Sequence, residues 1–185
     1  MRLVVGISGA SGAVYGIRLL EVLAEIDSVE THLTVTGNAV GIMEFETGRK
    51  LEEVQGLADR SYHVEDMNAP IASGSFLTDG MIIAPCSAKS LSAVAGSYTD
   101  NLLTRSADVT LKEGRKLVLA VRETPLHLGH LENMTKVARL GAVVVPPIPA
   151  FYHKPVDISD IVDHSVGKML DMFGIEHHLF RRWGQ

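Results

Sequence analysis

The sequence predicts an α/β fold: a doubly wound parallel sheet with helices on both faces, built as a single domain over residues 1–185. Two observations support this fold. Short runs of branched aliphatic residues alternate with longer segments of helical periodicity, and these apolar runs are continuous, as in strands that are covered on both faces. The composition also stays uniform along the chain, without repeats or low-complexity segments, which favours one domain.

Strands are expected at five short apolar runs, each bounded by Gly, Pro or polar residues. These runs are Leu3–Ile7, Leu33–Val35 with its flanks, Met81–Ala84, Leu117–Val121 and Ala142–Val145. Helical patterns cover Ala13–Ile26, about Ala39–Phe45, Leu51–Ala58, Ala88–Ala95, Leu102–Lys112, Leu126–Leu140 and Ile158–Phe173. The segment from Arg60 to Asp79 follows neither pattern, and we interpret it as a long candidate functional loop.

Composition and charge argue against several classes of protein. Hydrophobic residues make up 46% of the chain and the mean hydropathy is +0.17, which allows a substantial core. The net charge is −5 and no block of Lys and Arg exceeds two residues, which argues against nucleic acid as the main partner. The apolar runs are too short to span a membrane, and we expect a cytoplasmic protein. The one cysteine, Cys86, excludes an intramolecular disulfide and is expected to be buried.

Ligands of a parallel sheet bind beyond the carboxyl ends of its strands, so the residues that follow each strand are candidates for a site. After the first strand, "SGASG" (8–12) is rich in small residues, and the next helix begins with unpaired N–H groups and a positive dipole end. We expect the hydroxyl groups of Ser8 and Ser11 to donate hydrogen bonds to a phosphate there. The alternative is a tight turn with Ser11 as the helix N-cap and no ligand.

Two further strand ends offer hydroxyl groups. Thr36 stands where an NAD site would place an acidic residue for the ribose, which argues for a mononucleotide or another phosphate. Its alternative role is to cap the next helix. The stretch "PCSAKSLS" places Ser87 and Ser90, beside Lys89, at the start of another helix. Together these ends predict a ligand with several hydrogen-bond acceptors.

Charged residues follow the apolar run that ends at Val121. Arg122 and Glu123 therefore belong to the carboxyl edge of the sheet, and we interpret them as site residues; the alternative is a mutual ion pair. Thr124 and Pro125 are predicted to be the N-cap and the first residue of the next helix.

Three other patterns of charged residues and histidines are explained by a structural role as readily as by a role in a binding or catalytic site. Arg105 and Lys112 are seven residues apart and share a helix face, as in a solvated cationic stripe. His127 and His130 lack a third metal ligand and are expected to be a packed or capping pair. The acidic stretch "DISDIVD" (157–163) is typical of a helix start, where the dipole favours acids. No metal site is therefore expected.

Six motifs complete the pattern. They are "GISGASGAVYGIRLL", "ASGSF", "PCSAKSLSAVA", "LLTRSADVTLKEGRKLVLAVRETPLHLGHLENM", "GAVVVPPIPAFYH" and "RWG". In this order, from residue 3 to 184, they resemble the UbiX/Pad flavin prenyltransferases. The resemblance implies a Rossmann-like fold and a homo-oligomer, commonly a dodecamer, with FMN between subunits. It also implies transfer of a dimethylallyl group from dimethylallyl monophosphate to reduced FMN, at N5 and then C6, without a metal ion. The prenylated FMN would pass to a UbiD-type decarboxylase.

The resemblance also implies roles for individual residues. FMN would contact Gly9, Ala10, Ser11, Thr36, Ser87, Ala88, Lys89, Ser90 and Arg122. The prenyl phosphate would contact Lys112, Glu123, Tyr152 and Lys168. Catalytic roles would fall to Ser11, Glu46, Arg105, Lys112 and Glu123. The C-terminal segment, residues 174–185, is expected to pack on a neighbouring subunit.

The chain departs from the common family pattern at three positions. Many relatives have "SKAA" where this chain has "TGNAV", so Thr36 replaces a serine and Gly37 replaces a lysine. Without the positive charge of that lysine, the contact near the FMN phosphate is expected to be weaker. Lys89 stands where small residues are common. Two other functions stay open: an FMN enzyme that oxidatively decarboxylates a cysteine, and a non-catalytic flavin carrier. The first would need a catalytic histidine and a substrate clamp that these motifs do not resemble.

Overall fold

The computed structural model of the chain describes residues 1–184 and contains one six-stranded sheet in which all neighbouring strands are parallel. The strands are β1 (Arg2–Ile7), β2 (Glu30–Val35), β3 (Arg60–His63), β4 (Gly80–Cys86), β5 (Lys116–Val121) and β6 (Val143–Val144). Their order across the sheet is β3-β2-β1-β4-β5-β6. This is the doubly wound order of dinucleotide-binding folds, with its switch point between β1 and β4, so the predicted fold class is confirmed.

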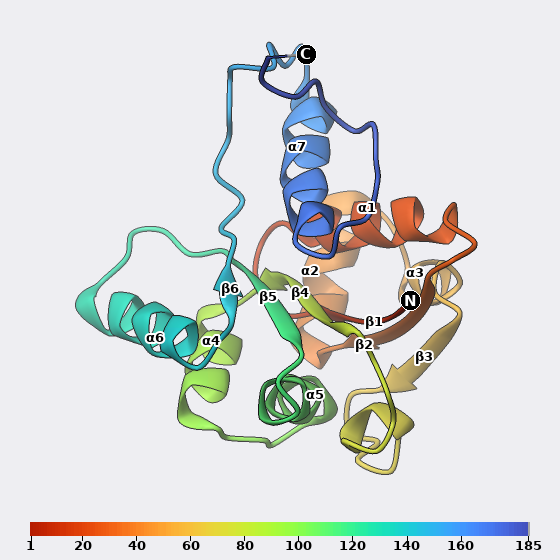
Figure 1. Cartoon of the computed structure of the whole chain (residues 1–185), viewed down its shortest axis with the longest axis vertical. Helices are drawn as coiled ribbons and strands as arrows, with labels where there is room; N and C mark the ends of the chain where they lie inside the picture. Colours follow the sequence, from red (N-terminus) through yellow and green to blue (C-terminus); the bar gives the residue numbers. More distant parts are fainter. Residues whose placement is uncertain (185) are drawn as a thin grey trace.

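Helices cover both faces of the sheet (Figure 1). One face carries α1 (Ala13–Ala24), α2 (Gly37–Thr47), α3 (Leu51–Gln55) and α7 (Ile158–Asp171). The other face carries α4 (Ala88–Gly96), α5 (Leu102–Lys112) and α6 (Leu128–Arg139), and a 3-10 turn, η1, spans Pro70–Ala72. The alternation predicted from the apolar runs is therefore correct, and no helix within residues 1–184 is long and apolar enough to cross a bilayer.

Two predictions about local structure are wrong. The segment from Arg60 to Asp79 is not a continuous loop, because β3 forms at its start; as a largely exposed edge strand with the sequence RSYH, β3 lacks the apolar run that marks the others. Helix α6 begins at Leu128 and not at Pro125. The N-cap is His127, whose Nδ1 accepts a hydrogen bond from the Gly129 N–H at 3.1 Å, so Thr124 does not cap the helix.

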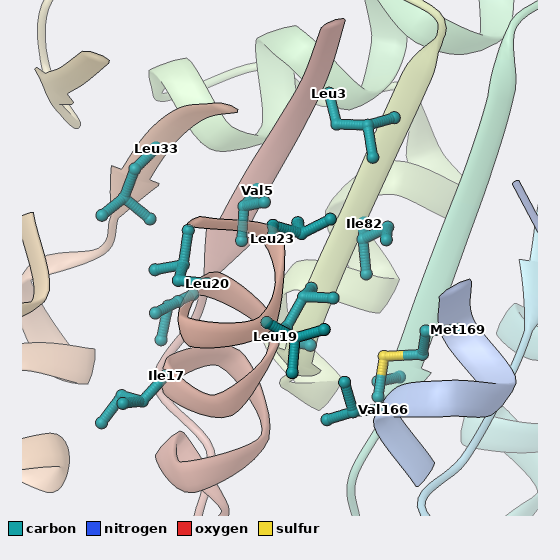
Figure 2. Packing of buried hydrophobic residues seen from close by; sticks show 14 of the residues in the cluster. Leu3, Val5, Ile17, Leu19, Leu20, Leu23, Leu33, Ile82, Val166 and Met169 are labelled. Carbon is teal, nitrogen blue, oxygen red and sulfur yellow. The ribbon is translucent and has the colours of Figure 1, made fainter. Parts of the chain in front are cut away.

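Side chains of the sheet alternate between two cores, one on each face. Leu3 and Val5 of β1 and Ile82 of β4 point to the same face, where α1 and α7 pack on them (Figure 2). Gly16 lets α1 approach the sheet closely, because a Cβ at this position would lie 2.2 Å from the carbonyl oxygen of Ala84. The first turn of α1 is thereby held beside the carboxyl end of β4.

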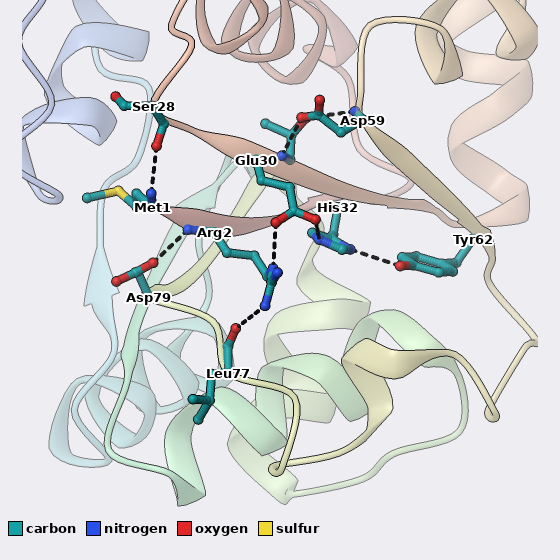
Figure 3. Close-up of polar contacts among 10 residues, drawn as sticks. Met1, Arg2, Ser28, Glu30, His32, Asp59, Tyr62, Leu77 and Asp79 are labelled. Carbon is teal, nitrogen blue, oxygen red and sulfur yellow. Dashed lines mark hydrogen bonds and ion pairs between the residues drawn. The ribbon is translucent and has the colours of Figure 1, made fainter.

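A chain of polar contacts ties the amino ends of the strands together (Figure 3). Arg2 Nε donates to Glu30 Oε2 at 2.8 Å, and Arg2 Nη1 donates to the carbonyl of Leu77 at 2.9 Å. The buried His32 lies 3.1 Å from Glu30 Oε1 through Nε2 and 2.9 Å from the Tyr62 hydroxyl through Nδ1. These contacts lie away from the carboxyl edge and stabilise the sheet there.

Residues 145–184, called here the C-terminal arm, leave β6, turn back through α7 and end in a strap along that helix (Figure 1). Asp171 holds the strap: its carboxylate accepts from Arg182 at 2.7 and 3.1 Å, and His177 Nε2 lies at 3.2 Å. Gly167 lets the strap lie close, because a Cβ there would meet His177 and Phe180 at 2.6 Å. The expected packing of 174–185 on a neighbouring subunit stays a prediction, and Gln185 lies outside the described residues.

Candidate active site

A cleft of about 420 Å³ opens at the carboxyl edge of the sheet. It lies at the switch point between β1 and β4, where the fold predicts a ligand, and its size is within the usual range of ligand pockets. Seven of the residues predicted to form the site line it together: Gly9, Thr36, Ser87, Ala88, Lys89, Ser90 and Glu123. The structure thus brings together residues that follow four different strands.

Ser87 and Ser90 form the start of α4 at the floor of the cleft. Ser87 is the N-cap: its Oγ accepts from the Ser90 N–H and donates to Ser90 Oγ, both at 3.1 Å. Ser8 fastens this turn to β1, because its buried hydroxyl donates to the Pro85 carbonyl at 2.8 Å and accepts from the Ser87 N–H at 2.8 Å. The prediction that Ser8 donates to a phosphate is therefore wrong, and its role is structural.

The start of α1 also differs from prediction. The N-cap is Gly12, with φ +98°, and not Ser11. The N–H groups of Gly12 and Ala13 are not left for an anion, because Glu46 Oε2 accepts from them at 2.8 and 3.2 Å. Glu46 thus occupies the place that sequence reasoning gave to a phosphate at this helix start, and Ser11 contacts the same carboxyl group.

Glu46 is an ionised carboxylate in this position. Partial desolvation raises its pKa, but the hydrogen bonds from Ser11, Gly12 and Ala13, together with the positive charge of Arg122, outweigh that effect and bring the pKa below its ordinary value. Two residues predicted to act near the flavin, Glu46 and Arg122, are therefore electrostatically coupled in one chain.

Thr36 follows β2 at the wall of the cleft. Thr36 is the N-cap residue of α2, as the alternative expected, but its hydroxyl makes no capping hydrogen bond. Its Oγ1 is buried without a hydrogen-bond partner, and buried polar atoms of this kind are rare unless a ligand or water completes them. The adjacent Gly37 has open space around it, since nothing lies within 4 Å of where its Cβ would be. The residues at this end of the cleft therefore fit a ligand with hydrogen-bonding oxygens.

Arg122 and Glu123 follow β5 as predicted. The Arg122 N–H donates to the Cys86 carbonyl at 3.0 Å, which joins this turn to the end of β4. Glu123 lines the cleft, and its Oε1 accepts from the Thr124 N–H at 3.0 Å. Within residues 1–184 the two side chains form no ion pair with each other, so that alternative is wrong.

Sequence reasoning missed part of the cleft wall. It comes from the end of β3 and the start of α5, and its residues are Val64, Glu65, Asp100, Asn101 and Thr104. Lys89 Nζ lies 3.9 Å from Asp100 Oδ2, so an acidic side chain faces the unusual lysine. One signal was available: Asn101 caps α5 by accepting from the Thr104 N–H at 3.0 Å, a pattern that marks a helix start at the sheet edge.

Arg105 and Lys112 do not line the cleft of their own chain. Arg105 Nε donates to the Ala72 carbonyl at 3.0 Å, and its Nη1 lies 3.3 Å from Asp108 Oδ2. Lys112 pairs with Glu113 at the far end of α5, four residues before β5 begins at Lys116. The amino group of Lys112 therefore lies at the amino edge of the sheet, opposite the cleft.

Tyr152 and Lys168 lie in the C-terminal arm, and neither lines the cleft of its own chain. Lys168 Nζ pairs with Asp171 Oδ2 at 3.3 Å. Tyr152 lines a separate pocket of about 450 Å³, and several of the other lining side chains are cationic. The lining residues of that pocket are Tyr152, His153, Lys154, Arg181, Arg182, Trp183 and Gly184.

The two histidines of α6 are a packed pair, as predicted. The rings of His127 and His130 stack with centroids 3.7 Å apart, and His127 caps the helix. In the part of the chain that the structure describes, no group of three or more His, Cys, Asp or Glu side chains is placed to hold a metal ion. Cys86 is fully buried, and burial raises the pKa of its thiol to about 12, so it is no nucleophile.

Comparison with known proteins agrees with this geometry. The family model described as Flavoprotein matches residues 1–182, so fold and site define a flavoprotein. A flavin prenyltransferase UbiX from Salmonella typhimurium is 56% identical over 184 residues, covering 98% of this chain and 97% of that protein. The chain belongs to the UbiX-type flavin prenyltransferases, which are transferases, and the predicted family and enzyme class are confirmed.

Two solved structures share the whole fold. A dodecameric FMN-dependent UbiX-like decarboxylase from Escherichia coli is 50% identical with a TM-score of 0.98, and the match covers 100% of both chains. A structure of AnUbiX in complex with FMN and dimethylallyl pyrophosphate is 48% identical with a TM-score of 0.97, covering 100% of this chain and 97% of the other. The predicted Rossmann-like fold agrees with both.

Proposed function

We propose that this chain binds FMN in the cleft at the switch point and transfers a dimethylallyl group from dimethylallyl monophosphate to reduced FMN. The observation that carries the proposal is the unpartnered Thr36 hydroxyl in a cleft of about 420 Å³. Gly9, Ala10 and Ser11 would let the ligand approach the backbone, and Ser87 to Ser90 with Arg122 would contact its flavin part. The relative AnUbiX, solved with FMN, supports this choice of ligand.

Reduced FMN would supply the nucleophilic atoms, N5 first and C6 second, that receive the prenyl carbons. The residues of the chain would hold the two reactants in contact, which removes much of the entropic barrier. They would also neutralise the phosphate that leaves. Lys112, Lys168 and Arg122 carry the positive charge for this, and the Tyr152 hydroxyl would hydrogen-bond a phosphate oxygen. These cations would perform the work that a metal ion performs in other prenyl transfers.

A complete site requires residues from more than one copy of the chain. Lys112 lies at the amino edge, opposite the cleft, and Tyr152 and Lys168 lie in the C-terminal arm. No one chain brings these three to its own cleft, so we propose a homo-oligomer, a dodecamer, in which neighbouring copies complete each site. The dodecameric relative from Escherichia coli supports this assembly.

A base must take the proton that flavin C6 loses when the second bond forms, and the candidates are Glu123, Glu46 and the released phosphate itself. Glu46 already accepts two backbone hydrogen bonds, so its carboxylate is engaged at the start of α1. Glu123 lines the cleft with one short contact to a backbone N–H, so we assign the proton to Glu123 and a positioning role for α1 to Glu46. The prenylated FMN would then pass to a UbiD-type decarboxylase.

One assay tests the activity. The purified protein is mixed with reduced FMN and dimethylallyl monophosphate without oxygen, and mass spectrometry follows a flavin that is heavier by one five-carbon unit. Product with wild type and loss of product with Glu123→Gln are expected, whereas Glu132→Gln on the exposed face of α6 should leave the rate unchanged. A parallel reaction with the pyrophosphate decides between the two donors. Absence of the heavier flavin would exclude the enzyme and favour a flavin carrier.

A further inference from the structure

The hydroxyl of Tyr152 is held by a buried histidine of the next helix. Tyr152 lies in the loop before α7, and its Oη is 2.9 Å from Nε2 of His164. His164 is 7% exposed, whereas Tyr152 is 43% exposed and lines the pocket of about 450 Å³ in the C-terminal arm. The histidine therefore touches the inner side of the hydroxyl group, and the outer side stays open to a ligand.

The ring of His164 cannot turn away from this contact. It stacks on His153 with centroids 4.9 Å apart and an interplanar angle of 7°, and it packs against Phe180 at 4.6 Å. The Tyr152 ring in turn meets His164 edge to face at 5.5 Å. Three aromatic neighbours thus fix the direction in which Nε2 points.

His164 is neutral at pH 7 because burial lowers its pKa, and the nearby His153 and Lys168 lower it further, against a smaller opposite effect of Asp171. A neutral imidazole has one N–H donor and one acceptor nitrogen. When Nε2 accepts, the Tyr152 hydrogen points at the histidine and only oxygen lone pairs face the pocket. When Nε2 donates, the hydroxyl hydrogen is directed outward and can donate to an anion.

We propose that His164 is a positioning residue: its Nε2–H donates to the Tyr152 hydroxyl and turns the hydroxyl hydrogen toward the phosphate of the prenyl donor. The inference rests on the proposed function, because it takes Tyr152 as a ligand of that phosphate. The phosphate selects the tautomer of His164 that leaves the tyrosine free to donate. His164 itself does not touch the substrate.

The test compares two amides at position 164. In His164→Gln the amide nitrogen can occupy the place of Nε2, whereas in His164→Asn the shorter side chain places it near Nδ1, out of reach of Tyr152 Oη. Both variants lose the ring stacking to the same degree. We expect His164→Asn to raise KM for dimethylallyl monophosphate about fivefold with kcat little changed, as for one lost hydrogen bond. His164→Gln should stay within about twofold of wild type by the same reasoning.

A double-mutant cycle separates positioning from packing. In the Tyr152→Phe background, His164→Asn should raise KM no further, because the hydroxyl it directs is gone. Equal effects of His164→Asn in both backgrounds, or equal KM values for the Asn and Gln variants, would overturn the inference alone. A wild-type protein that forms no prenylated flavin would instead overturn the proposed function, and the inference with it. We expect His164→Asn and His164→Gln to have the same affinity for FMN and the same midpoint of thermal unfolding.

Discussion

The carboxylate of Glu46, at the end of α2, caps the start of α1 through Gly12: its Oε2 accepts the Gly12 N–H at 2.8 Å and the Ala13 N–H at 3.2 Å. An acidic side chain far along the sequence therefore satisfies donors that the first turn leaves open. This contact joins two helices beside the cleft and keeps a negative charge near Arg122.

Replacing Glu46 by Gln should lower the free energy of unfolding at pH 7 by about 0.5 to 1 kcal/mol, as for a weakened helix cap. The pKa of Glu46 is lowered in the folded protein, so its contribution is present above its ordinary value of 4.5 and is lost as pH falls through the folded value. Urea unfolding at pH 7 and at more acidic values measures both effects. Glu44→Gln, an exposed neighbour on the same helix, serves as the control and should change neither.

Replacing Gly16 by Ala should destabilise the protein, because the new Cβ would lie 2.2 Å from the Ala84 carbonyl oxygen and 2.9 Å from Ile7. Overpacking of this kind costs about 1 to 3 kcal/mol. Gly41→Ala is the matched control: it also lies within a helix, but nothing is within 4 Å of the new atom, so it should stabilise by about 0.5 to 1 kcal/mol. Thermal unfolding that ranks the two variants in the opposite order would refute the close approach of α1 to β4.

Replacing Asp171 by Asn should release the strap from α7. The Arg182 guanidinium holds the pKa of this carboxyl near 2, so the contribution of Asp171 is present above its ordinary value of 3.8 and is lost as pH falls toward 2. Amide hydrogen exchange of residues 176–183 should accelerate in the variant at pH 7, and in wild type only at strongly acid pH. Asp27→Asn, an exposed turn residue, should leave this exchange unchanged.

Two inactive variants should restore each other. Lys112→Ala removes a cation at the amino edge and Glu123→Gln alters the cleft, so each alone should form little product. In co-expressed assemblies, some sites would combine the intact Lys112 of one copy with the intact Glu123 of another, and part of the activity should return. Mixtures that stay as inactive as the separate variants would contradict a site completed between copies.

Cys86 should resist alkylation in the folded protein. It is fully buried and its thiol pKa is raised to about 12, so at pH 8 almost no thiolate is exposed to reagent. Iodoacetamide should label it only after unfolding, with mass spectrometry as the readout. Rapid labelling of the native protein would show that the end of β4 opens in solution.

The sequence predicted the fold well because its strongest signals are local. The buried strands β1, β4 and β5 are continuous apolar runs; small or hydroxylated residues follow β1 and β4, and charged residues follow β5. The edge strand β3 escaped prediction because one of its faces meets water and its side chains are polar. Prediction thus succeeded for strands that are buried on both faces, because such strands appear in the sequence as continuous apolar runs.

Prediction of the site failed where partners are distant in the chain. Nothing around Gly12 indicates that Glu46 fills the helix start, and nothing around Ser8 indicates that its hydroxyl is used by Pro85 and Ser87. The roles of Tyr152 and Lys112 came from resemblance, and only the folded chain shows that they lie apart from the cleft. Motif spacing identifies which side chains matter, and that neighbouring copies of the chain bring Tyr152 and Lys112 to each cleft is our proposal.

With neighbouring copies completing each site, as we propose, the separation of the cleft from the C-terminal arm would make turnover a collective property. A lone protomer would carry a place for the flavin and a place for the isoprenoid phosphate without ever opposing them, so dissociated protein would leave reduced flavin unreacted. The rate per protomer should therefore decline on dilution, as the assembly dissociates.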